Sequence, residues 1–521
     1  MSLKNLQLKT HSFQLLSALI GGIFMGLTVA PFGAWFLAWI ALAPLWVLIV
    51  SSAAQRTKSS PPAALLALGW GIGYHGLALF WITGIHPMTW MGVPWLASLG
   101  IAIFCLTFIT LWGAGLVAVW AIAFKAAFIP NGFIRVLIGT ALWCGLEALW
   151  SNGALYWSSV SYTQSPHNLL ILHLGQVSGS SAVTAAIVAV NGLIAEGWIN
   201  RTDARRMRFV NSYLISAATL LITLHLIGFS LYTRPLVQPP ETALKVGIIQ
   251  GNVPNEIKLY PEGFRRAIQG YTSGYLTLAN QGVDAVLTPE GALPFFQRDL
   301  KDTSIISAIK QKGVVAWIGA FGERGRSYTN SLFTFTGNGE IFSRYDKAKL
   351  VPIGEYIPFE EIFGGIIQRL SPLDEHQVPG SPNQVFDTPF GRAIVGICYE
   401  SAFSGQFRRQ AQKGGEFMLS PSNDAHYSAA MPMQHHAQDI MRAIESDRWA
   451  VRATNTGYSA FVDPHGRTLW ISGHNTYETH AETIYRRQTQ NFYVRWGDWL
   501  TPLLLGLAAV SWFIKRRIKA S

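Results

Sequence analysis

The stretch that decides the fold is Gly391-Arg392-Ala393-Ile394-Val395-Gly396-Ile397-Cys398-Tyr399-Glu400, an apolar run that ends at a cysteine. Its apolar residues predict a short buried strand that delivers Cys398 to its carboxyl end. Open α/β sheets place their reactive groups at that end of their strands. Free cysteine is also among the most buried residue types, so Cys398 by itself is either core filler or a nucleophile.

Two other stretches favour a nucleophile. Ala285-Val286-Leu287-Thr288-Pro289-Glu290 is a second apolar strand that ends in a carboxylate, and Lys347 lies in Arg344-Tyr345-Asp346-Lys347-Ala348-Lys349-Leu350-Val351-Pro352-Ile353-Gly354-Glu355. A thiol with a pKa of about 8.5 is mostly protonated at neutral pH and needs a base or a cation beside it to react. We therefore expect Glu290 to take the proton and Lys347 to stabilise the thiolate and a later oxyanion.

Composition indicates two parts with different solvents. Of the 521 residues, 50% are hydrophobic and only 13% are charged, whereas globular proteins have about 25% charged residues. The deficit lies in 11–232 and 497–514, while 240–495 has an ordinary soluble composition. We predict a transmembrane domain at 1–232, a catalytic domain at 233–495, and a last transmembrane helix with a basic tail at 496–521. Eight apolar runs are long enough to span a bilayer, at about 12–30, 34–52, 63–84, 94–123, 133–151, 180–199, 211–231 and 497–514.

The positive charge is a matter of membrane topology. The formal charge is +11, but Lys and Arg gather in short clusters that flank apolar runs, so nucleic acid is not an expected partner. Every second connection between the predicted spans is basic, and the alternate ones contain no Lys or Arg. This pattern predicts that both termini are cytoplasmic. Seven spans before residue 240 then place the catalytic domain on the far side, which is the periplasm in a bacterium.

Cysteine and histidine usage does not indicate a metal or cofactor. Cys105 and Cys144 fall inside predicted spans, so Cys398 has no partner for a structural disulfide in the soluble part. His435 and His436 are adjacent on a predicted helix and lack ligands at metal-binding spacing. We assign them, and His426, to structure, and we expect neither a metal nor a cofactor.

Residues 240–495 alternate short apolar strands with helical segments, which predicts an α/β fold. Strands are predicted at 245–250, 285–288, 314–319, 332–336, 340–344, 392–398, 416–420 and 458–462, and helices at 261–281 and 432–449. A further amphipathic helix is predicted at 359–370, where the apolar stripe is either core or a membrane-facing lid.

Taken together, Glu290, Lys347 and Cys398 in their motifs resemble the Glu, Lys, Cys signature of the nitrilase (carbon-nitrogen hydrolase) superfamily. With seven spans before that domain and one after it, the whole chain resembles the apolipoprotein N-acyltransferase family. The resemblance implies a four-layer αββα sandwich for the soluble domain. It also implies that Glu355 holds Lys347 and that Tyr399 and Glu400 shape the site behind the nucleophile.

The resemblance further implies a ping-pong reaction in the bacterial inner membrane. A phospholipid, chiefly phosphatidylethanolamine, would acylate Cys398, and the thioester would pass its acyl chain to the α-amino group of a diacylglyceryl-cysteine at the N-terminus of an apolipoprotein. We expect the enzyme to act as a monomer.

Two other function classes remain open at this stage: a membrane-tethered amidase or nitrilase that uses the same residues with water, and a transporter or scaffold with an inactive enzyme domain. Each charged residue could also have a purely structural role: Glu290 as a carboxylate at a helix start, Lys347 and Lys349 on a solvated strand face, and Glu355 and Glu400 as surface charges. The three motifs in order are a better description than three coincidences.

Overall fold

The computed structural model describes residues 3–55, 61–201, 207–352, 354–356 and 377–520, so the helix expected at 359–370 lies outside the described residues. The chain divides into two compact units. The first comprises Met1–Thr83, Ile101–Arg234 and Trp496–Ser521, and the second comprises Gly84–Gly100 and Pro235–Arg495. The segment 84–100, which the sequence assigned to the transmembrane domain, is therefore grouped with the second unit.

The first unit is built of apolar helices. Among the described residues, five segments are long and apolar enough to cross a membrane, namely Trp35–Ala53, Trp95–Ala126, Gly132–Trp150, Ser180–Asn200 and Asn211–Tyr232. The other three expected spans correspond to the helices α1 (Leu3–Gly26), α3 (Ala63–Ala78) and α18 (Leu500–Ala520). The apolar parts of the first two are short, at His11–Gly26 and Ala63–Ala78, so the predicted count of eight spans is not confirmed.

Asn191 shows how a buried polar side chain of this unit is paired within it. The side-chain oxygen of Asn191, in α8 (Ser180–Asn200), accepts hydrogen bonds from the backbone N–H groups of Leu42 and Ala43 at 2.9 and 3.0 Å. These N–H groups lie at the start of α2 (Ala43–Gln55), where a helix has no backbone partners of its own. Such pairing is what an apolar surrounding demands of every polar group.

The second unit contains two six-stranded sheets among its described residues. The first has the order β12 (Glu478–Tyr485), β1 (Ala243–Gln250), β2 (Ala285–Leu287), β3 (Val315–Arg324), β4 (Ser327–Phe335), β5 (Ile341–Asp346). The second has the order β11 (Thr468–Ile471), β10 (Ala460–Val462), β9 (Ala450–Thr454), β8 (Phe417–Ser422), β7 (Gly391–Val395), β6 (Phe386–Thr388).

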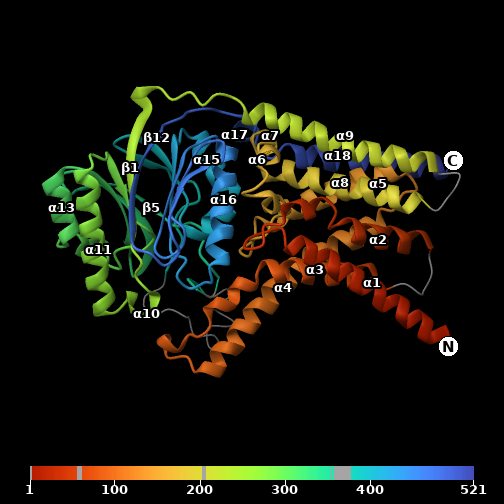
Figure 1. Ribbon diagram of the computed structural model, residues 1–521, viewed down its shortest axis with the longest axis horizontal. Helices are drawn as coiled ribbons and strands as arrows, with labels where there is room; N and C mark the ends of the chain where they lie inside the picture. Colours follow the sequence, from red (N-terminus) through yellow and green to blue (C-terminus); the bar gives the residue numbers. More distant parts are fainter. Residues whose placement is uncertain (1–2, 56–60, 202–206, 353, 357–376, 521) are drawn as a thin grey trace. The chain divides into compact units, whose positions relative to one another are not determined.

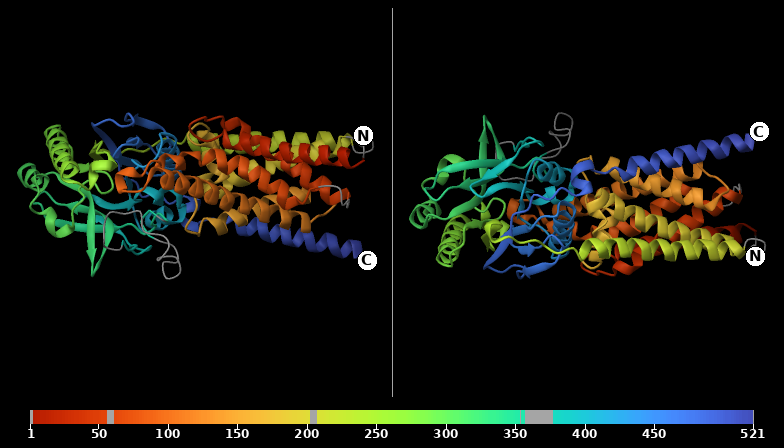
Figure 2. Two further views of the ribbon diagram at one scale, coloured as in Figure 1. Left: turned by 90° about the horizontal axis from the view of Figure 1, so that it is seen from below. Right: turned by 90° about the horizontal axis from the view of Figure 1, so that it is seen from above.

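These elements form four layers, as the resemblance implied (Figure 1, Figure 2). The two sheets pack face to face through a core to which both contribute, with Val246 and Leu287 from one sheet and Val395 and Leu419 from the other. The helices α11 (Pro261–Asn280) and α13 (Ser304–Lys312) cover the outer face of the first sheet. The helices α15 (Ser404–Gln412) and α16 (Ala430–Ser446) pack on the second sheet.

Parallel pairing brings the predicted strand ends to the site. β1, β2 and β3 are parallel, with Val246 opposite Ala285 and Ala285 opposite Val315. β7, β8 and β9 are also parallel. Glu290 follows β2, Cys398 follows β7 and Asn423 follows β8, so all three lie just beyond the carboxyl ends of parallel strands, as expected for reactive groups of α/β folds.

The segment 84–100 contacts the chain just after β8. The backbone at Gly84 approaches Ser428 so closely that an added Cβ would lie 2.6 Å from its nitrogen. The ring of Trp90 stacks on that of His426 with centroids 6.1 Å apart. A connection between two apolar helices, α3 and α4 (Trp95–Ala126), is thus part of the α/β unit and borders its site.

Candidate active site

An ammonium group lies between two carboxylates. Nζ of Lys347 is 2.8 Å from Oε1 of Glu290 and 2.8 Å from Oε1 of Glu355. The three side chains are 1%, 7% and 16% exposed, in the order Lys347, Glu290, Glu355. Burial would lower the pKa of Lys347, but the charges of Glu290 and Glu355 outweigh it and raise that pKa well above its usual value. Lys347 is therefore a permanent cation at this site.

Two asparagines that the sequence analysis did not single out complete the surroundings of Glu290. Asn330 on β4 donates from Nδ2 to Oε1 at 2.7 Å, and the backbone N–H of Asn423 donates to Oε2 at 2.9 Å. With the bond from Lys347, both oxygens of Glu290 are held in place. The only sequence signal was the short motif Ser422-Asn423-Asp424 after a predicted strand.

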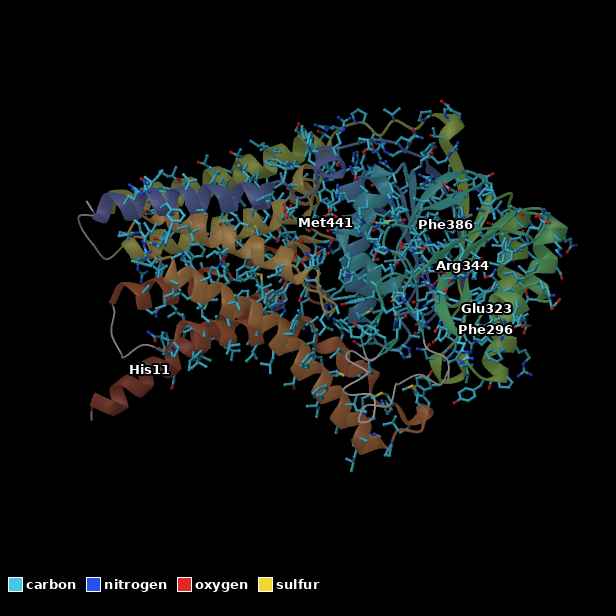
Figure 3. All side chains as sticks on the ribbon, turned by 180° about the vertical axis from the view of Figure 1, so that it is seen from behind. His11, Phe296, Glu323, Arg344, Phe386 and Met441 are labelled. Carbon is cyan, nitrogen blue, oxygen red and sulfur yellow. The ribbon has the colours of Figure 1, made fainter. Side chains whose placement is uncertain are left out.

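The charged residues next to Lys347 in sequence have partners of their own and do not pair with it. The guanidinium group of Arg344, on β5, donates to both oxygens of Asp346 at 2.6 and 2.9 Å (Figure 3 labels Arg344). The carboxylate of Asp346, which precedes Lys347 in sequence, is thereby paired with Arg344. Lys349, the other lysine of the motif, instead lies over the ring of Phe403 with Nζ 4.7 Å from the centroid.

Cys398 lies at a sharp turn beside this cluster. Its φ is 52°, a left-handed conformation that is uncommon for residues with a side chain. Burial and the negative charge of Glu290 raise the pKa of the Cys398 thiol well above its usual value, while the charge of Lys347 and a hydrogen bond from the backbone of Asn423 act in the opposite direction. The resting group is therefore a neutral thiol, which needs a proton acceptor before it can attack.

Glu400 connects the lysine segment to the cysteine turn. Its carboxylate accepts hydrogen bonds from the backbone N–H groups of Ala348 at 2.7 Å and Ile397 at 2.8 Å, and from the hydroxyl of Tyr345 at 3.2 Å. Glu400 is fully buried, and burial raises its pKa. Of the two residues predicted to shape the site behind Cys398, Glu400 thus holds backbone in place, whereas the ring of Tyr399 packs edge-on against Phe403 at 5.1 Å.

A buried polar network supports Cys398 from α16. Nε2 of His435 lies 2.8 Å from the carbonyl oxygen of Cys398, and Nδ1 lies 2.9 Å from the guanidinium of Arg452. Arg452 in turn donates to Asp424 at 2.9 Å and to Asp439 at 2.7 Å. A carbonyl oxygen can only accept a hydrogen bond, so Nε2 of His435 carries a proton and donates it to Cys398, while Nδ1 also lies 3.1 Å from Oδ1 of Asp424.

This network fixes the direction of one peptide. In a trans peptide the C=O and the N–H point in opposite directions. With the carbonyl of Cys398 bound to His435, the N–H of Tyr399 is directed away from α16. The histidine that the sequence analysis assigned to structure therefore orients the backbone immediately after the thiol.

The same residues do not fit a metal ion. One ligand atom each from Cys398, Asp424 and His435 lie within 4.8 Å of one another. The guanidinium of Arg452, however, contacts both Asp424 and His435 at 2.9 Å and already supplies the positive charge. A second cation would have to displace that buried arginine, so we derive no metal chemistry from this cluster.

Comparison with known proteins gives the family. Residues 245–492 match the carbon-nitrogen hydrolase family, and residues 21–193 match the apolipoprotein N-acyltransferase N-terminal domain. The chain is 71% identical over 490 residues to an apolipoprotein N-acyltransferase of Nostoc sp., covering 94% of this chain and 97% of that protein. It belongs to the apolipoprotein N-acyltransferase family. A Synechocystis sp. member is 49% identical over 94% of this chain and 98% of its own length. Among solved structures, an amidase from Nesterenkonia sp. is similar, with a TM-score of 0.36 and 16% identity over 50% of this chain and 95% of that one.

Glu290→Gln should shift the reactivity of the thiol to lower pH. The substitution removes a negative charge that raises the pKa of Cys398, so the thiolate forms at a lower pH while Lys347 remains beside it. Alkylation of Cys398 by iodoacetamide, followed by mass spectrometry across pH, measures the shift. Acyl transfer should fall in the same variant because an amide accepts no proton. Glu323→Gln, at a partly exposed carboxylate that pairs with Arg298, is the control. An unchanged or upward-shifted curve for Glu290→Gln contradicts the predicted effect of its charge on Cys398.

His435→Leu should slow acylation of Cys398 about tenfold or more, because one correctly aimed backbone donor is worth at least that much. His435→Gln should retain most of the rate, because its side-chain amide can still donate to the carbonyl of Cys398. KM for the ester should change little in either variant, because His435 binds the backbone carbonyl of Cys398 and not the ester. His436→Gln, a buried neighbour that contacts Thr468 at 2.9 Å, is the matched control. Equal losses in the Leu and Gln variants, or none in either, would refute a positioning role.

Proposed function

We propose that this chain transfers an acyl chain from a membrane phospholipid, phosphatidylethanolamine above all, to the α-amino group of the N-terminal diacylglyceryl-cysteine of apolipoproteins. Family membership over nearly the whole chain supports this function. The observation that carries the mechanism is the buried Lys347–Glu290 pair, joined to the thiol of Cys398 through the backbone N–H of Asn423.

In the first half-reaction, Glu290 accepts the proton of Cys398 as the sulfur attacks the ester carbonyl of the phospholipid. The oxyanion that forms is stabilised by Nζ of Lys347 and by the N–H of Tyr399. When the intermediate collapses, the C–O bond of the ester breaks and Glu290 returns its proton to the departing alkoxide. The products are a thioester on Cys398 and a lysophospholipid.

In the second half-reaction, the neutral α-amine of the apolipoprotein attacks the thioester. Glu290 accepts a proton from the attacking nitrogen, and the same two donors stabilise the oxyanion. Collapse breaks the C–S bond, the amide is released, and the proton held by Glu290 passes to the sulfur. Glu355 and Glu400 keep Lys347 and the cysteine turn in place throughout, through the contacts given above.

In this function both substrates are held in the bilayer, one as a lipid and the other as a lipid-anchored protein. The apolar helical unit would keep the enzyme in the same bilayer. We place eight spans in the bacterial inner membrane, counting Leu3–Gly26, Ala63–Ala78 and Leu500–Ala520 beside the five long apolar segments. Residues 1–232 then form a seven-span domain, 233–495 a periplasmic catalytic domain, and 496–521 a last helix with its tail. The charge of alternate connections supports cytoplasmic termini. We propose a monomer, since all the residues invoked come from one chain.

The acyl-enzyme is the direct test of this function. Incubation with phosphatidylethanolamine should add one acyl chain to Cys398, and the adduct should persist in water and leave only when a diacylglyceryl lipopeptide with a free amine is added. Mass spectrometry measures both steps. Cys398→Ala and Cys398→Ser should form no adduct, because a serine hydroxyl is too weakly acidic for the same base. Rapid hydrolysis of the wild-type adduct would instead indicate a membrane-tethered amidase.

Lys347→Ala should lower the rate of acylation roughly a hundredfold or more, about 3 kcal/mol of oxyanion stabilisation. Lys349→Ala is the matched control: that ammonium lies over Phe403, and its loss should cost far less. Single-turnover rates, normalised to the amount of folded protein, give the comparison. The assignment of the cation is wrong if Lys349→Ala proves the more damaging change.

A further inference from the structure

A second lysine lies beside the predicted site and takes no part in the mechanism above. Lys258 ends the short helix α10 (Asn255–Lys258), and its Nζ lies 3.4 Å from the backbone carbonyl oxygen of Glu290. A Cβ added to Gly291 would be 3.4 Å from the same Nζ. The ammonium group therefore lies next to the peptide that joins Glu290 and Gly291. The sequence analysis did not select it, because nothing local distinguishes it from a solvated lysine.

The charge of Lys258 has no counterion among the residues that the structure describes. Lys347 is held by two carboxylates, whereas Lys258 makes no ion pair in the described ranges and contacts only a carbonyl oxygen. Burial lowers the pKa of Lys258 to about 8, although the negative charge of Glu290 and that of Cys398 in its thiolate form work to raise it. The negative charges near Lys258 do not fully balance its positive charge. A ligand that brings an anion would therefore stabilise the ammonium group.

Charge selects which substrate can supply that anion. The acceptor brings an α-amino group, which is neutral or positive. The phospholipid donor brings a phosphodiester, which is negative at all physiological pH values and is attached to the same glycerol as the ester that reacts. An ester held at Cys398 keeps its phosphate within one glycerol unit of the thiol, and Lys258 lies beside the residue that activates that thiol.

We propose that Lys258 binds the phosphate of the phospholipid donor and so determines which class of ester is presented to Cys398. This inference rests on the proposed acyl transfer and adds a recognition site to it. Lys258 acts through the part of the donor that does not react. Its loss should therefore affect phospholipid donors and spare an ester that has no phosphate.

The experiment compares two donors on the full-length protein in mixed micelles. One is phosphatidylethanolamine, and the other is the p-nitrophenyl ester of the same fatty acid. Thioester formation on Cys398 is measured for both by mass spectrometry. Lys258→Met should lower kcat/KM for the phospholipid about tenfold or more, as expected for one charge-assisted hydrogen bond, and change that for the p-nitrophenyl ester less than about twofold. Lys258→Arg should restore most of the preference.

Lys245→Met is the matched control, because Lys245, near the start of β1, also donates to a backbone carbonyl, that of Gln281 at 2.6 Å. It should leave both donors unaffected. Equal losses with both donors in Lys258→Met would mean that the lysine acts on Cys398 or Glu290, and the inference would be overturned. An unchanged ratio would overturn it as well. Failure of the proposed function looks different, since the wild-type protein would then form no adduct from any phospholipid.

Discussion

The ion triplet Glu290–Lys347–Glu355 is the interaction on which the site depends. Taking an ion out of water costs several kcal/mol, and a buried ammonium is stable only when its surroundings return that energy. Lys347 achieves this with two carboxylates at 2.8 Å. Because the three residues come from a segment after β2 and from the chain after β5, their pairing also fixes how those loops meet.

The thiol of Cys398 comes from the other sheet. Cys398 follows β7 of the second sheet, whereas Glu290 follows β2 of the first. Packing the two sheets through one apolar core brings the two strand ends together, and Asn423 and Glu400 then connect them through backbone hydrogen bonds. The four-layer architecture therefore joins a carboxylate and an ammonium group from loops of one sheet to a thiol from the other.

A second charged network, behind the thiol, holds the backbone. Arg452 lies between Asp424 and Asp439, and all three side chains are fully buried. Burial would raise the pKa of both aspartates, but the charge of Arg452 lowers both below their usual values. These carboxylates stay ionised with the arginine, so His435 faces a constant environment and holds the carbonyl of Cys398 in a single direction.

The sequence alone predicted those features that depend on only a few neighbouring residues. The apolar runs before Glu290 and Cys398 predicted their strands, and the resemblance carried by three short motifs implied the four layers. The strand β9 was not predicted because the helical pattern continues to residue 449, whereas α16 ends at Ser446 and Asp447 turns with a φ of 54°. The strand β12 was not predicted because polar residues dominate it on both faces, as an edge strand permits, although Ile484 is buried in the core. The contacts of Asn330, His435 and Lys258 with the site join residues far apart in sequence. Only the packing of the two sheets and their helices decides them, because hydrogen bonds between distant side chains leave no periodic trace in the chain.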